Sequence, residues 1–202
     1  MTHLPKIVFR YSRVYNSYFK NNPQILKYLN DNKKSYPEVN EITGFLKTIE
    51  KKWEKIGPKI LSEISTISNL EWKDIKVNCY IVGYCRPFSD PLTIKIYDNL
   101  DDFFIVLIHE LIHQIQIQNK LLYKNWIKYL LKNYSNKSKL TRGHIFLYSV
   151  FSKIIINNFG KDKLGRYRGK INRPEYREAF EIVDKEGIDN IINKFKKILS
   201  LR

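Results

Sequence analysis

Apolar residues recur along most of the chain at the spacing of amphipathic helices. Between residues 38 and 55 they stand three and four positions apart, which predicts a helix that Gly57 and Pro58 end. By contrast, residues 75–84 and 92–97 alternate between apolar and polar side chains. This alternation predicts two short strands joined by a proline-rich turn. We expect further helices at residues 23–29, 59–68, 121–133, 143–159, 175–185 and 188–199.

The segment that follows the second strand predicts a buried helix. Asn99, Asp101 and Asp102 suit an N-cap and a first helical turn, and the helix should continue to about Gln118. Because residues 103–112 are apolar nearly all round, this helix should lie inside the protein. The basic stretch 161–174 is expected to be irregular. The pattern therefore predicts an α+β fold, mostly helical, with a small β-hairpin or sheet that precedes the buried helix.

Composition fits one globular domain that spans residues 1–202. Apolar residues make up 43% of the chain and aromatic residues 14%, enough for a sizeable core. We expect residues 1–40 to form an N-terminal extension packed on this domain, and residues 75–185 to form its catalytic part. The longest apolar run, residues 103–108, is far shorter than a membrane span, and no export signal is recognisable. We therefore expect a cytoplasmic monomer without a membrane partner.

The net charge of +16 allows two interpretations. Lysine outnumbers arginine and Ala179 is the only alanine, a composition typical of an AT-rich genome. However, residues 121–170 hold twelve Lys and Arg and a single acid, Asp162. This region is the candidate surface for nucleic acid as a partner.

The clearest chemical signal is the motif His109-Glu110-Leu111-Ile112-His113. Two histidines four positions apart project from one face of a helix, where neutral imidazoles hold Zn²⁺. Glu110 lies beside them and can take a proton from water without binding the metal. The alternative is two core histidines and an ion-paired glutamate. The cost of burying three polar side chains in an apolar helix disfavours that alternative.

A strand, a turn, a strand and then a helix that carries this motif resemble the zincin metallopeptidases. The resemblance covers residues 76–120 and extends more loosely to about residue 185. It implies a peptidase with one Zn²⁺ per chain, protein or peptide substrates, and Glu110 as the general base. It also implies that residues 92–97 form the rim strand on which the substrate pairs. Because Gln-Ile-Gln-Ile-Gln-Asn follows His113, the chain lacks the HExxHxxGxxH motif of metzincins.

Catalytic zinc needs a third protein ligand. His144 resembles the third ligand of zincins with an HExxH…H arrangement, since thirty residues separate it from His113 and it begins an apolar helix. Glu178 and Glu181 compete for this role, and Cys85 is a weaker alternative. His3 lies near the N-terminus, and we do not expect it to bind the metal.

A zincin site also needs a group that stabilises the negative charge developing on the substrate carbonyl oxygen. We select Tyr176 because a helix that begins near Pro174 could fix its position. Tyr148, Tyr167 and Arg168 are the other candidates.

The competing hypothesis is a basic nucleic-acid-associated protein, either a DNA-linked protease or a non-catalytic binder with a structural metal site. Proteases that act on DNA–protein crosslinks resemble this chain in their HExxH…H pattern. Their relatives often carry a CxxC zinc ribbon, which is absent here. Support for this hypothesis therefore comes from the basic region 121–170 alone.

Overall fold

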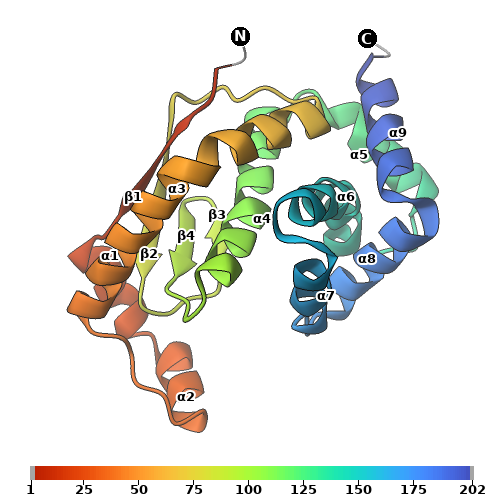
Figure 1. The fold of residues 1–202 in the computed structure, drawn as a ribbon. Coiled ribbons are helices and arrows are strands. Elements are labelled where there is room, and N and C mark those ends of the chain that lie inside the picture. The colour runs from red at the N-terminus through yellow and green to blue at the C-terminus, as the bar shows by residue number, and fades with distance from the viewer. Residues whose placement is uncertain (1–2, 201–202) are drawn as a thin grey trace. The chain divides into compact units, whose positions relative to one another are not determined.

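The computed structural model describes residues 3–200 and has an α+β fold, with helices over most of the chain and a four-stranded mixed sheet. Its elements are β1 (Lys6–Arg10), α1 (Arg13–Lys20), α2 (Pro23–Asp31), α3 (Val39–Ser68), β2 (Lys76–Val82), β3 (Phe88–Ser89), β4 (Leu92–Lys95), α4 (Leu100–Gln118), α5 (Tyr123–Asn133), α6 (Lys139–Phe159), α7 (Lys161–Gly169), α8 (Pro174–Glu186) and α9 (Ile188–Ser200) (Figure 1).

Contacts along the chain define two compact units. The first comprises residues 3–59 and 73–111, and the second comprises residues 60–72 and 112–200. The division falls inside α3 and α4. Each of these continuous helices therefore contributes its first part to the first unit and its second part to the second.

The sheet belongs to the first unit and has the strand order β1-β2-β4-β3. β1 pairs parallel to β2, β2 pairs parallel to β4, and β3 pairs antiparallel to β4. In the first pair, Phe9 lies opposite Cys79, and both side chains are buried. Burial on alternate positions of β1 thus places its apolar side chains in the core of this unit.

Aromatic packing joins this core to the helices. The ring of Trp53, from α3, stacks on Phe104 of α4 with centroids 5.9 Å apart. Phe9 meets the same indole edge-on at 6.2 Å. At the start of α4, the Asn99 side chain accepts hydrogen bonds from the backbone N–H groups of Asp101 and Asp102. The N-cap predicted from the sequence therefore fixes where the motif-bearing helix begins.

In the second unit, α6 is the central element. Its neighbours are α7, α8 and α9, and α5 packs on α9 (Figure 1). Phe146 of α6 stacks on Phe195 of α9 at 3.7 Å, and Tyr148 stacks on Phe180 of α8 at 3.8 Å. Gly160 has a φ of 85° and lets the chain turn directly from α6 into α7.

Two expectations about helices need correction. The chain does not break at Gly57-Pro58, because α3 continues through both residues. Proline removes one helical hydrogen bond, but buried side chains on both sides of it, Ile49 and Ile60, hold the helix against the core. The basic stretch 161–174, expected to be irregular, contains α7.

The sheet also differs from the expected pair of strands. Residues within the expected N-terminal extension supply β1, and the expected turn contains β3. As a result β4 lies between two strands, and β3 covers it at Leu92 and Thr93. The strand expected to form a free rim is therefore partly paired. No helix within residues 3–200 is long and apolar enough to cross a membrane.

A buried hydrogen-bond network fixes the end of β2. The backbone N–H of Gly83 donates to the side-chain oxygen of Asn16 at 3.0 Å and to the hydroxyl of Tyr36 at 3.1 Å. The Tyr36 hydroxyl itself donates to the same Asn16 oxygen at 2.7 Å. A Cβ on Gly83 would lie 2.4 Å from the Tyr36 ring.

We expect Gly83→Ala to lower the free energy of unfolding by about 1–3 kcal/mol, because the buried, hydrogen-bonded ring has little room to move. Urea unfolding followed by circular dichroism measures this change. Gly44→Ala is the matched control, since a Cβ there meets no atom within 4 Å in an exposed turn of α3. It should raise stability by about 0.5–1 kcal/mol. Equal effects of the two substitutions would contradict the expected clash.

Candidate metal centre

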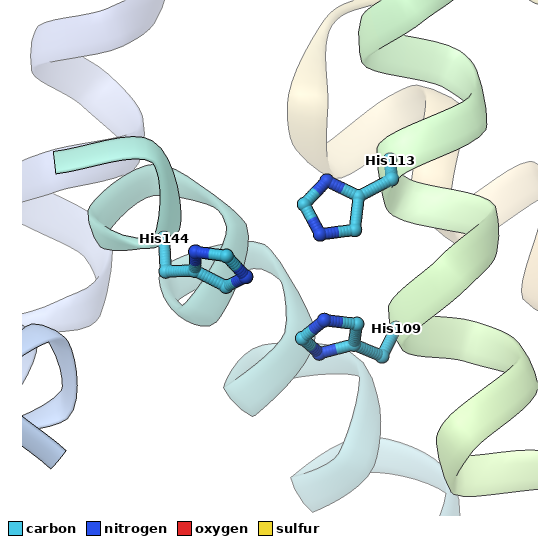
Figure 2. A group of neighbouring side chains, drawn as sticks. All are labelled: His109, His113 and His144. Carbon is cyan, nitrogen blue, oxygen red and sulfur yellow. The ribbon is translucent and has the colours of Figure 1, made fainter. Parts of the chain in front are cut away.

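Three imidazoles from two helices face one another (Figure 2). His109 and His113 lie one turn apart on α4, and His144 lies in the second turn of α6. Their candidate ligand atoms all lie within 4.8 Å of one another. The shared helix fixes His109 relative to His113. Packing inside the second unit fixes His113 relative to His144, with ring centroids 5.1 Å apart.

His109, His144 and the adjacent Glu110 are buried in an otherwise apolar setting, and His113 is partly exposed. His109 is 6% exposed, Glu110 7% and His144 5%. The α4 residues around the motif, including Ile108, Leu111 and Ile112, are fully buried. Polar groups in such a place require partners that offset their loss of hydration.

The protonation state of the histidines suits metal binding. Burial, together with the neighbouring His144, lowers the pKa of His113 to about 4, so this imidazole is neutral at pH 7. His144 lies 2.8 Å from the backbone carbonyl of Leu140 through its Nδ1. Because a carbonyl only accepts, Nδ1 carries the proton and Nε2 carries the lone pair.

The donor set fits a zinc ion. Neutral imidazoles are preferred ligands of Zn²⁺, and three of them leave one coordination position for water or substrate. The hydrogen bond from His144 to a backbone carbonyl is the kind of support that orients ligand histidines. Here the acceptor is the backbone carbonyl of Leu140 on the same helix.

Glu110 directly follows His109 on α4. Burial raises the pKa of this carboxyl to about 7, and the positive charge of Arg86 opposes the rise. Sequence reasoning did not select Arg86. It lies between β2 and β3. It is the single Lys or Arg between residues 77 and 94, and this isolation is the one feature of the sequence that could have singled it out.

The structure also places Tyr176 beside the cluster. Its ring centroid lies 4.5 Å from that of His144, and the ring of Tyr148 lies 5.3 Å from His144 on the same helix. Tyr148 is fully buried, whereas Tyr176 is partly exposed. Of these two tyrosines, Tyr176 is therefore the one that a substrate could reach.

The two other candidates for this role have different surroundings. The ring of Tyr167 packs on Phe151 at 4.8 Å. The guanidinium of Arg168 pairs with Asp184 and lies 4.7 Å from the ring centroid of Phe180.

The alternative third ligands lie outside the cluster. Glu178 accepts hydrogen bonds from Lys137 at 2.6 Å and Thr141 at 2.8 Å, and these bonds lower its pKa. Glu181 is exposed. Burial raises the pKa of the Cys85 thiol to about 12, so it is protonated and a poor ligand. His3 is exposed, and it too is outside the cluster.

Comparison with protein families, curated proteins and solved structures found no match to this chain. The interpretation of the centre therefore rests on its own residues and their geometry.

Proposed function

We propose that this protein is a zinc-dependent metallopeptidase of the zincin type, with His109, His113 and His144 as metal ligands. One observation carries the proposal: three imidazoles, two of them buried, have their candidate ligand atoms within 4.8 Å of one another, and a buried glutamate follows the first of them in the chain. A helix that serves only the core has no need of four such groups. A catalytic zinc ion accounts for all of them.

Each residue has a role that follows from its position. Bound zinc supplies Lewis acidity, which polarises a substrate carbonyl and lowers the pKa of water. Glu110 accepts a proton from the attacking water on a carboxylate oxygen and donates it to the nitrogen of the leaving amine. A pKa near 7 suits both transfers at neutral pH.

Tyr176 supplies the second polar contact to the substrate. Its ring packs against that of His144, so the proposed metal ligand and the tyrosine restrict each other's orientation. The hydroxyl donates a hydrogen bond to the carbonyl oxygen as negative charge develops there. Tyr148 also contacts His144, with ring centroids 5.3 Å apart, from inside the core.

We expect one zinc ion per chain in protein purified without a metal-affinity tag. His109→Ala and His144→Ala should each lower zinc affinity by at least about 100-fold, because losing a ligand costs more than losing the partner that orients it. Mass spectrometry of metal content checks this. The control is His3→Ala, an exposed histidine outside the cluster, which should keep its zinc.

The two other results have distinct meanings. Zinc retained by His144→Ala would move the third ligand to another side chain, with Glu178 tested next. A wild-type protein that takes up no zinc even when zinc is supplied would end the peptidase proposal.

We expect Glu110→Gln to lower kcat for peptide cleavage by about 10²–10⁴-fold while zinc content is unchanged, because only the proton transfer is removed. Cleavage of casein or a peptide library, followed by mass spectrometry, gives the measurement. Glu181→Gln, an exposed change on α8, is the control and should keep full activity. Cleavage that persists in Glu110→Gln would assign the activity to another site or a contaminant.

Tyr176→Phe tests the proposed charge stabilisation separately. It keeps the ring against His144 and removes the hydroxyl, so kcat should fall by about 10²–10³-fold with little change in KM. Loss of zinc in this variant would instead indicate that Tyr176 only supports the ligand.

A further inference from the structure

A pocket of about 520 Å³ lies beside His113 in the second unit. The end of α4, α5 and the start of α6 form its walls. Its aliphatic lining includes Ile117, Ile127 and Leu131, which are 45%, 48% and 50% exposed. Large apolar side chains gathered around a hollow at this exposure are typical of a binding site.

The charged part of the lining is entirely basic. Lys120, Lys139 and Arg142 border the pocket. Arg142 is held in place by the backbone carbonyls of Tyr134 and Lys137, to which its guanidinium donates hydrogen bonds. The pocket thus combines an aliphatic surface with three cations, of which Arg142 is held by backbone carbonyls.

The sequence around the pocket explains this one-sided charge. Between Glu110 and Asp162 the chain contains nine Lys and Arg and no acidic residue. All residues that line the pocket come from this stretch. A ligand that carries negative charge next to a bulky apolar group would be complementary to both parts of the lining.

We infer that this pocket selects polypeptide substrates in which a bulky apolar side chain is flanked by Asp or Glu. The inference rests on the proposed function, because His113 lines the pocket and also belongs to the metal centre. A side chain seated in the pocket therefore belongs to a residue close to the bond that is cut. The apolar group fills the hollow, and Lys120, Lys139 and Arg142 contact the neighbouring carboxylates.

The lining favours a polypeptide over nucleic acid. Unpaired bases bind by stacking on aromatic side chains. Apart from the imidazole of His113, Tyr123 is the one aromatic residue of the lining, and its ring is packed against Phe195 at 5.1 Å. The apolar side chains that remain in the lining are aliphatic, which suits Leu, Phe or Met side chains of a protein.

The decisive experiment measures binding without cleavage. The full-length Glu110→Gln protein, loaded with zinc, is titrated into a short fluorescein-labelled peptide in which Leu-Phe is flanked by Asp and Glu. Fluorescence anisotropy gives the Kd. Two further peptides serve as comparisons. In one, Lys replaces the Asp and Glu residues, and in the other, Ser-Ser replaces Leu-Phe. Each should bind at least about tenfold more weakly than the first peptide.

Matched variants in the same background locate the site. Ile127→Glu and Lys120→Glu change the lining, and each should raise the Kd for the acidic peptide by about tenfold or more. Leu121→Glu and Lys124→Glu make the same chemical changes at exposed positions of this stretch outside the lining. They should shift the Kd by less than about twofold.

Gly143 offers a variant that fills the pocket. It lines the pocket within α6, and a Cβ there meets no atom within 4 Å. Gly143→Phe should therefore block peptide binding. Zinc content and thermal unfolding of this variant are measured in parallel, so that loss of the metal centre or of the fold is distinguished from a blocked pocket.

Three results would overturn the inference. The first is equal binding of the acidic and basic peptides, and the second is an equal effect of the lining and control variants on the Kd. The third is binding of a single-stranded oligonucleotide or of dodecanoate at the same lining residues that is tighter than binding of the acidic peptide. Each leaves the peptidase proposal standing, because zinc content and cleavage are measured separately. Conversely, the acidic peptide could bind selectively although the wild-type protein cleaves no peptide. The pocket would then remain a docking site for acidic peptides, and the peptidase proposal would be rejected.

Discussion

Keeping buried imidazoles neutral is the constraint on which the centre depends. A charged histidine in the apolar surroundings of α4 and α6 would lose most of its hydration. The pKa of His113 is low because burial disfavours its charged form. This constraint has a chemical consequence, because a neutral imidazole is both the form that the interior tolerates and the form that binds a metal.

The same surroundings act on Glu110 in the opposite direction. Burial raises its pKa, while it lowers that of His113, since desolvation penalises whichever form is charged. One apolar setting therefore favours an imidazole that is free of its extra proton at His113 and a carboxyl that exchanges its proton near neutral pH at Glu110. Arg86 moderates the effect on the carboxyl.

The sequence could place two of the three clustered histidines because their spacing is set locally. His109 and His113 are set one turn apart by the helix itself, and Asn99 marks where that helix begins. β1 gave no comparable signal, since its partner β2 lies some seventy residues away and only long-range pairing shows the strand. α3 passed through Pro58 because tertiary burial outweighed a local preference. The pocket beside His113 was also beyond local reasoning, because three separate helices form it.

The support of His144 by its own helix has a consequence for motion. The carbonyl that holds its Nδ1 belongs to Leu140, in the first turn of α6, and the side chain of Ser138 caps that turn through the backbone N–H of Thr141. Helix ends open and close more often than helix centres. Each opening of this turn releases the carbonyl that orients the imidazole. A ligand bound at His144 would therefore slow hydrogen exchange at the start of α6, and the lifetime of the bound metal would be linked to the fraying of one helical turn.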